Sequence, residues 1–96
     1  MELQWILGAR DAFAAVYGKE KGSSVCSAVM PGILADFRRT AQKRAEGERL
    51  REEYLTDDKR RVAVTVTGER RGAHSLITCI EINGKPVPLP PAGLEI

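Results

Sequence analysis

Histidine, cysteine and aromatic residues are scarce in this chain of 96 residues. It has one histidine, two cysteines and an aromatic content of 5%. His74, Cys26 and Cys79 lack the close spacing that zinc ligands need, and no glycine-rich loop opens a helix as in phosphate-binding sites. A Cys–His catalytic pair would have to bring His74 to one of these cysteines. We therefore expect no metal ion, no cofactor and no enzymatic activity.

Long apolar runs are also missing. No stretch approaches the roughly 20 residues that a membrane-spanning helix requires. The N-terminus carries Glu2 where a signal peptide would have basic residues. We expect a cytoplasmic protein with no membrane partner, whose two cysteines stay reduced. A chain of this length predicts a single domain over residues 1–96.

The excess of positive charge is small. A net charge of +2 does not by itself predict binding to nucleic acid. The basic residues nevertheless form two clusters, and clustering is what contact with several phosphates requires. Nucleic-acid binding is therefore the alternative function, through Arg38, Arg39, Lys43 and Arg44 in one cluster and Arg60, Arg61, Arg70 and Arg71 in the other.

The first part of the chain, residues 1–55, predicts helices. Apolar residues recur at spacings of three and four over residues 2–17, and Gly18 is suited to end that helix. Residues 19–24 are expected to be a polar loop, and residues 24–30 fit either a short helix or a buried strand. Residues 31–55 predict one long charged helix that starts at Pro31, or two helical pieces joined near Gly47.

Residues 60–89 predict a β-meander. The alternation of Val62, Val64 and Val66 with polar residues indicates a half-buried strand over 60–67. Residues 68–72 are expected to connect it to a strand over 75–82, which is apolar on both faces and therefore central. Residues 90–96 are expected to form a flexible tail.

The third strand of this meander is expected over residues 85–89. Asn83-Gly84 predicts the tight hairpin turn that leads into it. Pro86 and Pro88 lack N–H groups on one side, so they confine the strand to an edge of the sheet. The same prolines also fit a PxxP ligand, which we favour less than the strand.

The predicted fold class is α+β. It consists of two or three N-terminal helices, one of them long and charged, packed on a C-terminal three-stranded antiparallel β-meander.

The order of charges along residues 31–55 opposes the helix macrodipole, because basic residues come early and acidic residues late. The apolar stripe of Leu34, Phe37 and Ala41 also breaks off in the middle of this segment. Antiparallel pairing of two copies would match each basic half with an acidic half. We therefore expect a homodimer or another protein partner, bound through Arg38, Arg39, Lys43, Arg44, Glu48, Arg51 and Glu52.

These observations favour a small non-enzymatic protein–protein interaction module. Adaptors, inhibitors and accessory proteins, including those of phages and mobile elements, are often compact chains without catalytic motifs. The identity of the partner does not follow from the sequence.

Overall fold

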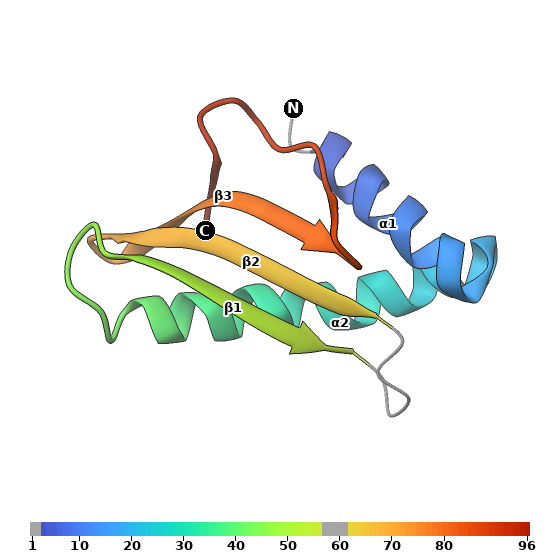
Figure 1. Cartoon of the computed structure of the whole chain (residues 1–96), viewed down its shortest axis with the longest axis horizontal. Helices are drawn as coiled ribbons and strands as arrows, with labels where there is room; N and C mark the ends of the chain where they lie inside the picture. The colour runs from blue at the N-terminus through green and yellow to red at the C-terminus, as the bar shows by residue number, and fades with distance from the viewer. Residues whose placement is uncertain (1–2, 57–61) are drawn as a thin grey trace.

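The computed structural model describes residues 3–56 and 62–96, which form two helices packed on an antiparallel sheet (Figure 1). The strands follow the order β1-β2-β3-β4, and β5 also pairs with β3. The α+β class is confirmed, whereas the prediction of three strands is wrong. The elements are α1 (Leu3–Tyr17), α2 (Lys19–Ala41), β1 (Arg49–Leu55), β2 (Ala63–Arg71), β3 (His74–Ile82), β4 (Lys85–Pro86) and β5 (Leu94–Glu95).

The two helices form a hairpin with a single residue, Gly18, between them. This residue has a φ of 93°, which glycine adopts without strain. The helix backbones then approach closely, since a Cβ on Gly22 would lie 2.5 Å from the backbone of Ala14. The polar loop expected over residues 19–24 is therefore wrong. Those residues begin α2, and residues 24–30 are helical.

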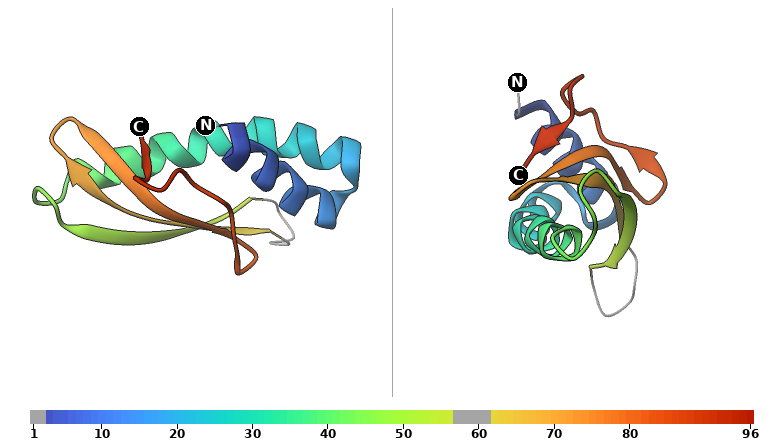
Figure 2. Two further views of the ribbon diagram at one scale, coloured as in Figure 1. Left: turned by 90° about the horizontal axis from the view of Figure 1, so that it is seen from above. Right: turned by 90° about the vertical axis from the view of Figure 1, so that its left-hand side faces the viewer.

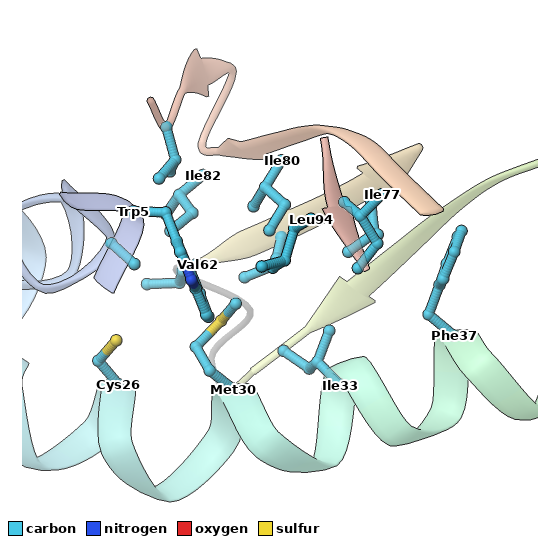
Figure 3. Packing of buried hydrophobic residues seen from close by; sticks show 14 of the residues in the cluster. Trp5, Cys26, Met30, Ile33, Phe37, Val62, Ile77, Ile80, Ile82 and Leu94 are labelled. Atoms are coloured by element: carbon cyan, nitrogen blue, oxygen red, sulfur yellow. The ribbon is translucent and has the colours of Figure 1, made fainter. Parts of the chain in front are cut away.

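One face of α2 supplies the helical side of the core. Its buried residues are separated by three or four positions, as burial along one helix face requires. Figure 3 shows several of them pointing towards the sheet. Pro31 lies inside α2 on its exposed side, so it does not begin a new helix as predicted. The buried residues are Gly22, Cys26, Met30, Ile33, Phe37 and Ala41.

The long helix expected over residues 31–55 is wrong in its second half. The helix ends at Ala41, and Arg49–Leu55 form strand β1 instead. Lys, Arg, Glu and Ala in residues 42–48 favour helix locally. Pairing of β1 with β2 buries Leu50, however, and tertiary packing overrides that preference. Gly47, with a φ of 75°, turns the chain into the strand.

Strands β2 and β3 form the centre of the sheet. Val62, Val64 and Val66 are fully buried, which confirms the predicted alternation. β2 continues to Arg71, so residues 68–72 are not the connecting loop that was expected. The turn is instead Gly72-Ala73, between the paired residues Arg71 and His74.

A register shift between Thr67 and Gly68 changes the phase of β3. The shift places Ile77 on the same buried face of the sheet as Ile80 and Ile82. Strict alternation had predicted Ile77 on the face opposite to Ile80 and Ile82. Gly68 is needed at this point because a Cβ there would lie 2.4 Å from the carbonyl oxygen of Leu76.

The C-terminal residues complete the sheet. Asn83 and Gly84 have φ values of 52° and 81°, which confirms the predicted tight turn. Only Lys85–Pro86 are assigned as strand β4, although the N–H of Val87 still donates to the carbonyl of Ile80 at 2.8 Å. The tail is not loose, because Leu94 is buried and β5 pairs with β3.

Both helices lie on the same side of the sheet (Figure 2). The opposite side of β1, β2 and β3 carries mainly polar side chains, among them Arg51, Glu53 and Glu81. This arrangement leaves the two edges of the sheet as the places where its backbone can meet another chain.

Candidate functional site at the edge of β1

The two edges of the sheet differ in how they are protected. Val87 uses its N–H within the sheet, so the ring nitrogens of Pro86 and Pro88 face outward and cannot donate. β1 contains no proline over its seven residues. In residues 3–56 and 62–96, no strand pairs with its outer side. β1 is therefore the edge that can accept another strand.

The backbone groups that β1 presents follow from its pairing with β2. Thr56 donates its N–H to the carbonyl of Val62 at 3.1 Å, so Thr56 faces β2. In an antiparallel ladder, successive residues point their backbone N–H and C=O groups alternately towards and away from the neighbouring strand. The backbone groups of Glu52 and Tyr54 therefore point towards β2 as well. The N–H and C=O groups of the intervening residues point away from β2. These are Arg49, Arg51, Glu53 and Leu55.

A groove runs between this edge and helix α2. Its volume is about 720 Å³, and we call it the β1 edge groove. The side chain of Leu55 at its border is 48% exposed, one of few large apolar side chains so exposed in the described part. The groove is lined from β1 by Glu53, Tyr54 and Leu55 with Thr56, and from α2 by Val29, Gly32, Ile33, Ala35, Asp36 and Arg39.

Gly32 is the one glycine in the wall of this groove. A Cβ at Gly32 would meet no atom within 4 Å, so packing inside this chain does not require glycine here. Glycine within a helix costs about 1 kcal/mol relative to alanine. Glycine at this position therefore leaves open space in the wall of the groove.

Charged residues surround the groove. Burial raises the pKa of Tyr54, Glu52 raises it further, and Arg39 lowers it. Arg39 also forms an ion pair with Asp36 on the next turn of α2. On the outer face of the sheet, Arg51 lies 3.7 Å from Glu81, measured between Nη2 and Oε1. The edge thus alternates basic and acidic groups within a few residues.

The residues predicted to bind a protein do not share one helical face. Arg38 and Arg39 lie on α2, whereas Lys43, Arg44 and Glu48 lie in the loop before β1. Arg44 and Glu48 do pair, with Nη1 and Oε2 3.4 Å apart, but across a turn and not along a helix. Arg51 and Glu52 lie on β1 and point to opposite faces of the sheet.

The arginines of the two basic clusters are largely engaged within the chain. Arg38 donates to the carbonyl of Ala73 at 3.2 Å, and Arg70 donates to those of Arg44 at 2.9 Å and Gly72 at 3.0 Å. These bonds fasten the loop after α2 to the tip of the β2–β3 hairpin. Arg71 pairs with Glu69.

The bonds to backbone carbonyls orient the Arg38 and Arg70 guanidinium groups but leave their charge, whereas ion pairs with Asp36 and Glu69 offset the charges of Arg39 and Arg71. Arg60 and Arg61 lie outside the described residues.

No catalytic arrangement joins the histidine and the cysteines. Cys26 is buried in α2, and this burial raises its thiol pKa, with Arg10 acting weakly in the opposite direction. A raised pKa disfavours the reactive thiolate. His74 is exposed at the hairpin, and its side chain forms no hydrogen bond with either cysteine in the described structure. Within the same residues, no three His, Cys, Asp or Glu side chains are grouped as metal ligands.

A second concave region lies between α1 and α2. It has a volume of about 360 Å³ and is mainly apolar, with Trp5, Met30 and Leu34 in its wall. Among the residues that the structure describes, Arg10 is the charged one in this lining. The region offers no pair of groups for acid–base chemistry.

Sequence reasoning missed Gly32, Glu53 and Leu55 as members of the site. The signal for β1 was present, because Leu50, Glu52 and Tyr54 recur at the period of two that places side chains on one strand face. Among the described helices, none combines the length and apolar character needed to cross a membrane. The chain matches no protein-family model, no curated protein and no solved structure.

Proposed function

We propose that this protein is a small non-enzymatic interaction module that binds an extended protein segment by strand addition at β1. The observation that carries the proposal is the unpaired outer side of β1 beside the β1 edge groove. In strand addition, main-chain hydrogen bonds supply affinity, and pockets for alternate side chains supply specificity.

The contrast between the two sheet edges supports this choice. Exposed edges promote unwanted pairing, and proteins commonly block them with proline or short strands. Edge strand β4 has both devices, whereas β1 is long and free of proline and relies on charged side chains, which a partner of matching charge can satisfy. An edge left open beside a groove is suited to a selected partner.

The residues of the site would have distinct roles. Arg51 and Glu53 would offer backbone hydrogen bonds and opposite charges, and Leu55 would add apolar contact. Gly32 would leave room for the incoming chain, and Arg39 would set the charge of the α2 wall. Nucleic-acid binding through the arginine clusters has less support, because the bonds of Arg38 and Arg70 serve the fold.

Site-specific photo-crosslinking tests this proposal. A photoreactive amino acid at Leu55, in the full chain expressed in its native cell, is expected to capture a discrete protein. The same group at Leu7 is the matched control, because Leu7 is similarly exposed, at 56% against 48%, but lies on α1. Glu53→Pro should abolish capture at Leu55, since it removes an outward N–H and leaves the bonds to β2 intact.

Circular dichroism and thermal unfolding would verify that the proline variant is folded. Equal capture from Leu55 and Leu7, or capture that survives Glu53→Pro, would contradict strand addition at β1.

A further inference from the structure

We infer that the strand added to β1 is β1 of a second copy of this chain, antiparallel and centred on Glu52. This inference rests on the proposed function and names its partner. The two copies would form one sheet that continues across a two-fold axis.

The backbone geometry suits this register. A two-fold axis beside Glu52 places Arg51 opposite Glu53 of the second copy, and Arg49 opposite Leu55. All four are residues whose N–H and C=O groups point away from β2. Directly opposed residues of this kind exchange both backbone hydrogen bonds. Every outward backbone group of both strands then has a partner over the whole length of β1.

The charges on the outer face are complementary in the same register. Arg51 faces Glu53 of the second copy, and the two-fold axis repeats the pair. Charged side chains usually protect an edge strand against pairing. Here their order, basic and then acidic, makes an antiparallel copy of the same strand an attractive partner. It differs from the complementarity expected from the sequence, which matched the basic and acidic halves of a helix over residues 31–55, because it involves Arg51 and Glu53 of one strand.

The face towards the helices distinguishes this register from its neighbours. Leu50 lies opposite Tyr54 of the second copy, which pairs two largely apolar side chains. Glu52 lies opposite its own equivalent, which is unfavourable. Shifting the centre to Arg51 or Glu53 would relieve that repulsion, but would oppose two like charges on the outer face and shorten the ladder. The inferred register therefore predicts one repulsive contact at a known position.

The wall of the β1 edge groove leaves space for the second strand. Gly32 and Ala35 of α2 present no long side chain, and the volume beside Gly32 is open. Asp36 and Arg39 follow on the same wall as an ion pair. Their charges balance, so the wall does not repel a strand that carries both signs.

Charge reversal with mixing tests the inference by sedimentation of the full chain. The wild type is expected to be a dimer, and Arg51→Glu and Glu53→Arg should each weaken association about tenfold or more, because two pairs become repulsive at once. An equimolar mixture of the two variants should form a heterodimer within about threefold of wild-type affinity. In that heterodimer, residues 51 and 53 of the two copies again carry opposite charges in both pairs.

Two further variants separate this interface from other effects. Glu81→Gln removes the ion pair between Arg51 and Glu81 without touching the edge, so it should change the dissociation constant less than about twofold. Glu52→Gln should tighten the dimer about threefold, because it removes the like-charge contact. A neutral effect of Glu52→Gln would overturn the register.

The results also separate this inference from the proposed function. A wild-type chain that is monomeric up to millimolar concentration, or variants that fail to rescue each other, overturns the second copy as the partner. If a monomeric chain still captures another protein at Leu55 in a manner that Glu53→Pro abolishes, strand addition stands and only the occupant is wrong. Failure of both experiments overturns both.

Discussion

Replacing Phe37 with alanine is expected to lower the free energy of unfolding by about 3–5 kcal/mol. The ring is fully buried between α2 and the sheet (Figure 3). Its neighbour across the core is Gly68, where a Cβ would come within 3.1 Å of the ring. Gly68 has no side chain that could move into the vacated space, so the cavity would stay open. A small domain has only about 5–15 kcal/mol of stability in total.

Urea unfolding followed by circular dichroism measures this loss. Leu7→Ala is the matched control, because Leu7 is 56% exposed and lies on the surface of α1. That variant should stay within about 0.5 kcal/mol of the wild type. A similar loss in both variants would show that Phe37 does not hold α2 on the sheet.

Two glycines of the same helix are expected to respond to alanine in opposite directions. Gly22→Ala should destabilise the fold by about 1–3 kcal/mol, because the new Cβ would lie 2.5 Å from the backbone of Ala14. The helices would have to separate, since the atoms that the Cβ would meet all belong to the backbone of Phe13 and Ala14. Gly32→Ala should instead stabilise it by up to about 1 kcal/mol, because helix propensity improves and nothing is displaced.

The pair of variants controls for helix propensity, which is the same in both. Thermal unfolding at one protein concentration, low enough to keep the chain monomeric, would give the two shifts in midpoint without a contribution from association. The close crossing of α1 and α2 is contradicted if Gly22→Ala is as stable as Gly32→Ala.

The sequence predicted those parts of the fold in which the apolar pattern has one interpretation. Val62, Val64 and Val66 alternate over their whole length, and Asn83-Gly84 permits one turn geometry, so both predictions are confirmed. The strand over residues 75–82 was expected, but the phase of its side chains was wrong. The register shift lies between Thr67 and Gly68, where Gly68 packs against Phe37 of α2, a residue distant in the sequence.

The boundary between α2 and β1 was harder to predict. Residues 42–46 are good helix formers, and local propensity therefore favoured a helix that continues past Ala41. The chain leaves the helix and enters strand β1 because β1 pairs with β2. β2 follows β1 closely in the chain, but this pairing is not visible in the local helix propensity. The opposite error occurred at residues 19–24, where lysine, glycine and serine suggested a loop. Gly22 instead lies where α1 packs closely against α2, and a Cβ there would lie 2.5 Å from the backbone of Ala14.

These errors determined what could be predicted of the site. The charge order along residues 31–55, basic first and acidic later, motivated the hypothesis of antiparallel self-association. Its placement on a helix hid the fact that Arg51 and Glu53 share one strand face and one direction of backbone hydrogen bonding. Gly32 could not be assigned to a groove, because α2 and β1 meet only in the folded chain.

Hydrogen exchange of the β1 amides tests the central claim most directly. At concentrations where the chain self-associates, the N–H groups of Arg51 and Glu53 are expected to exchange as slowly as those of Glu52 and Tyr54. On dilution, the outward pair should become fast, while Glu52 and Tyr54 stay protected by β2. Fast exchange at Arg51 and Glu53 at every concentration, with no partner added, would contradict pairing of β1 with a second copy.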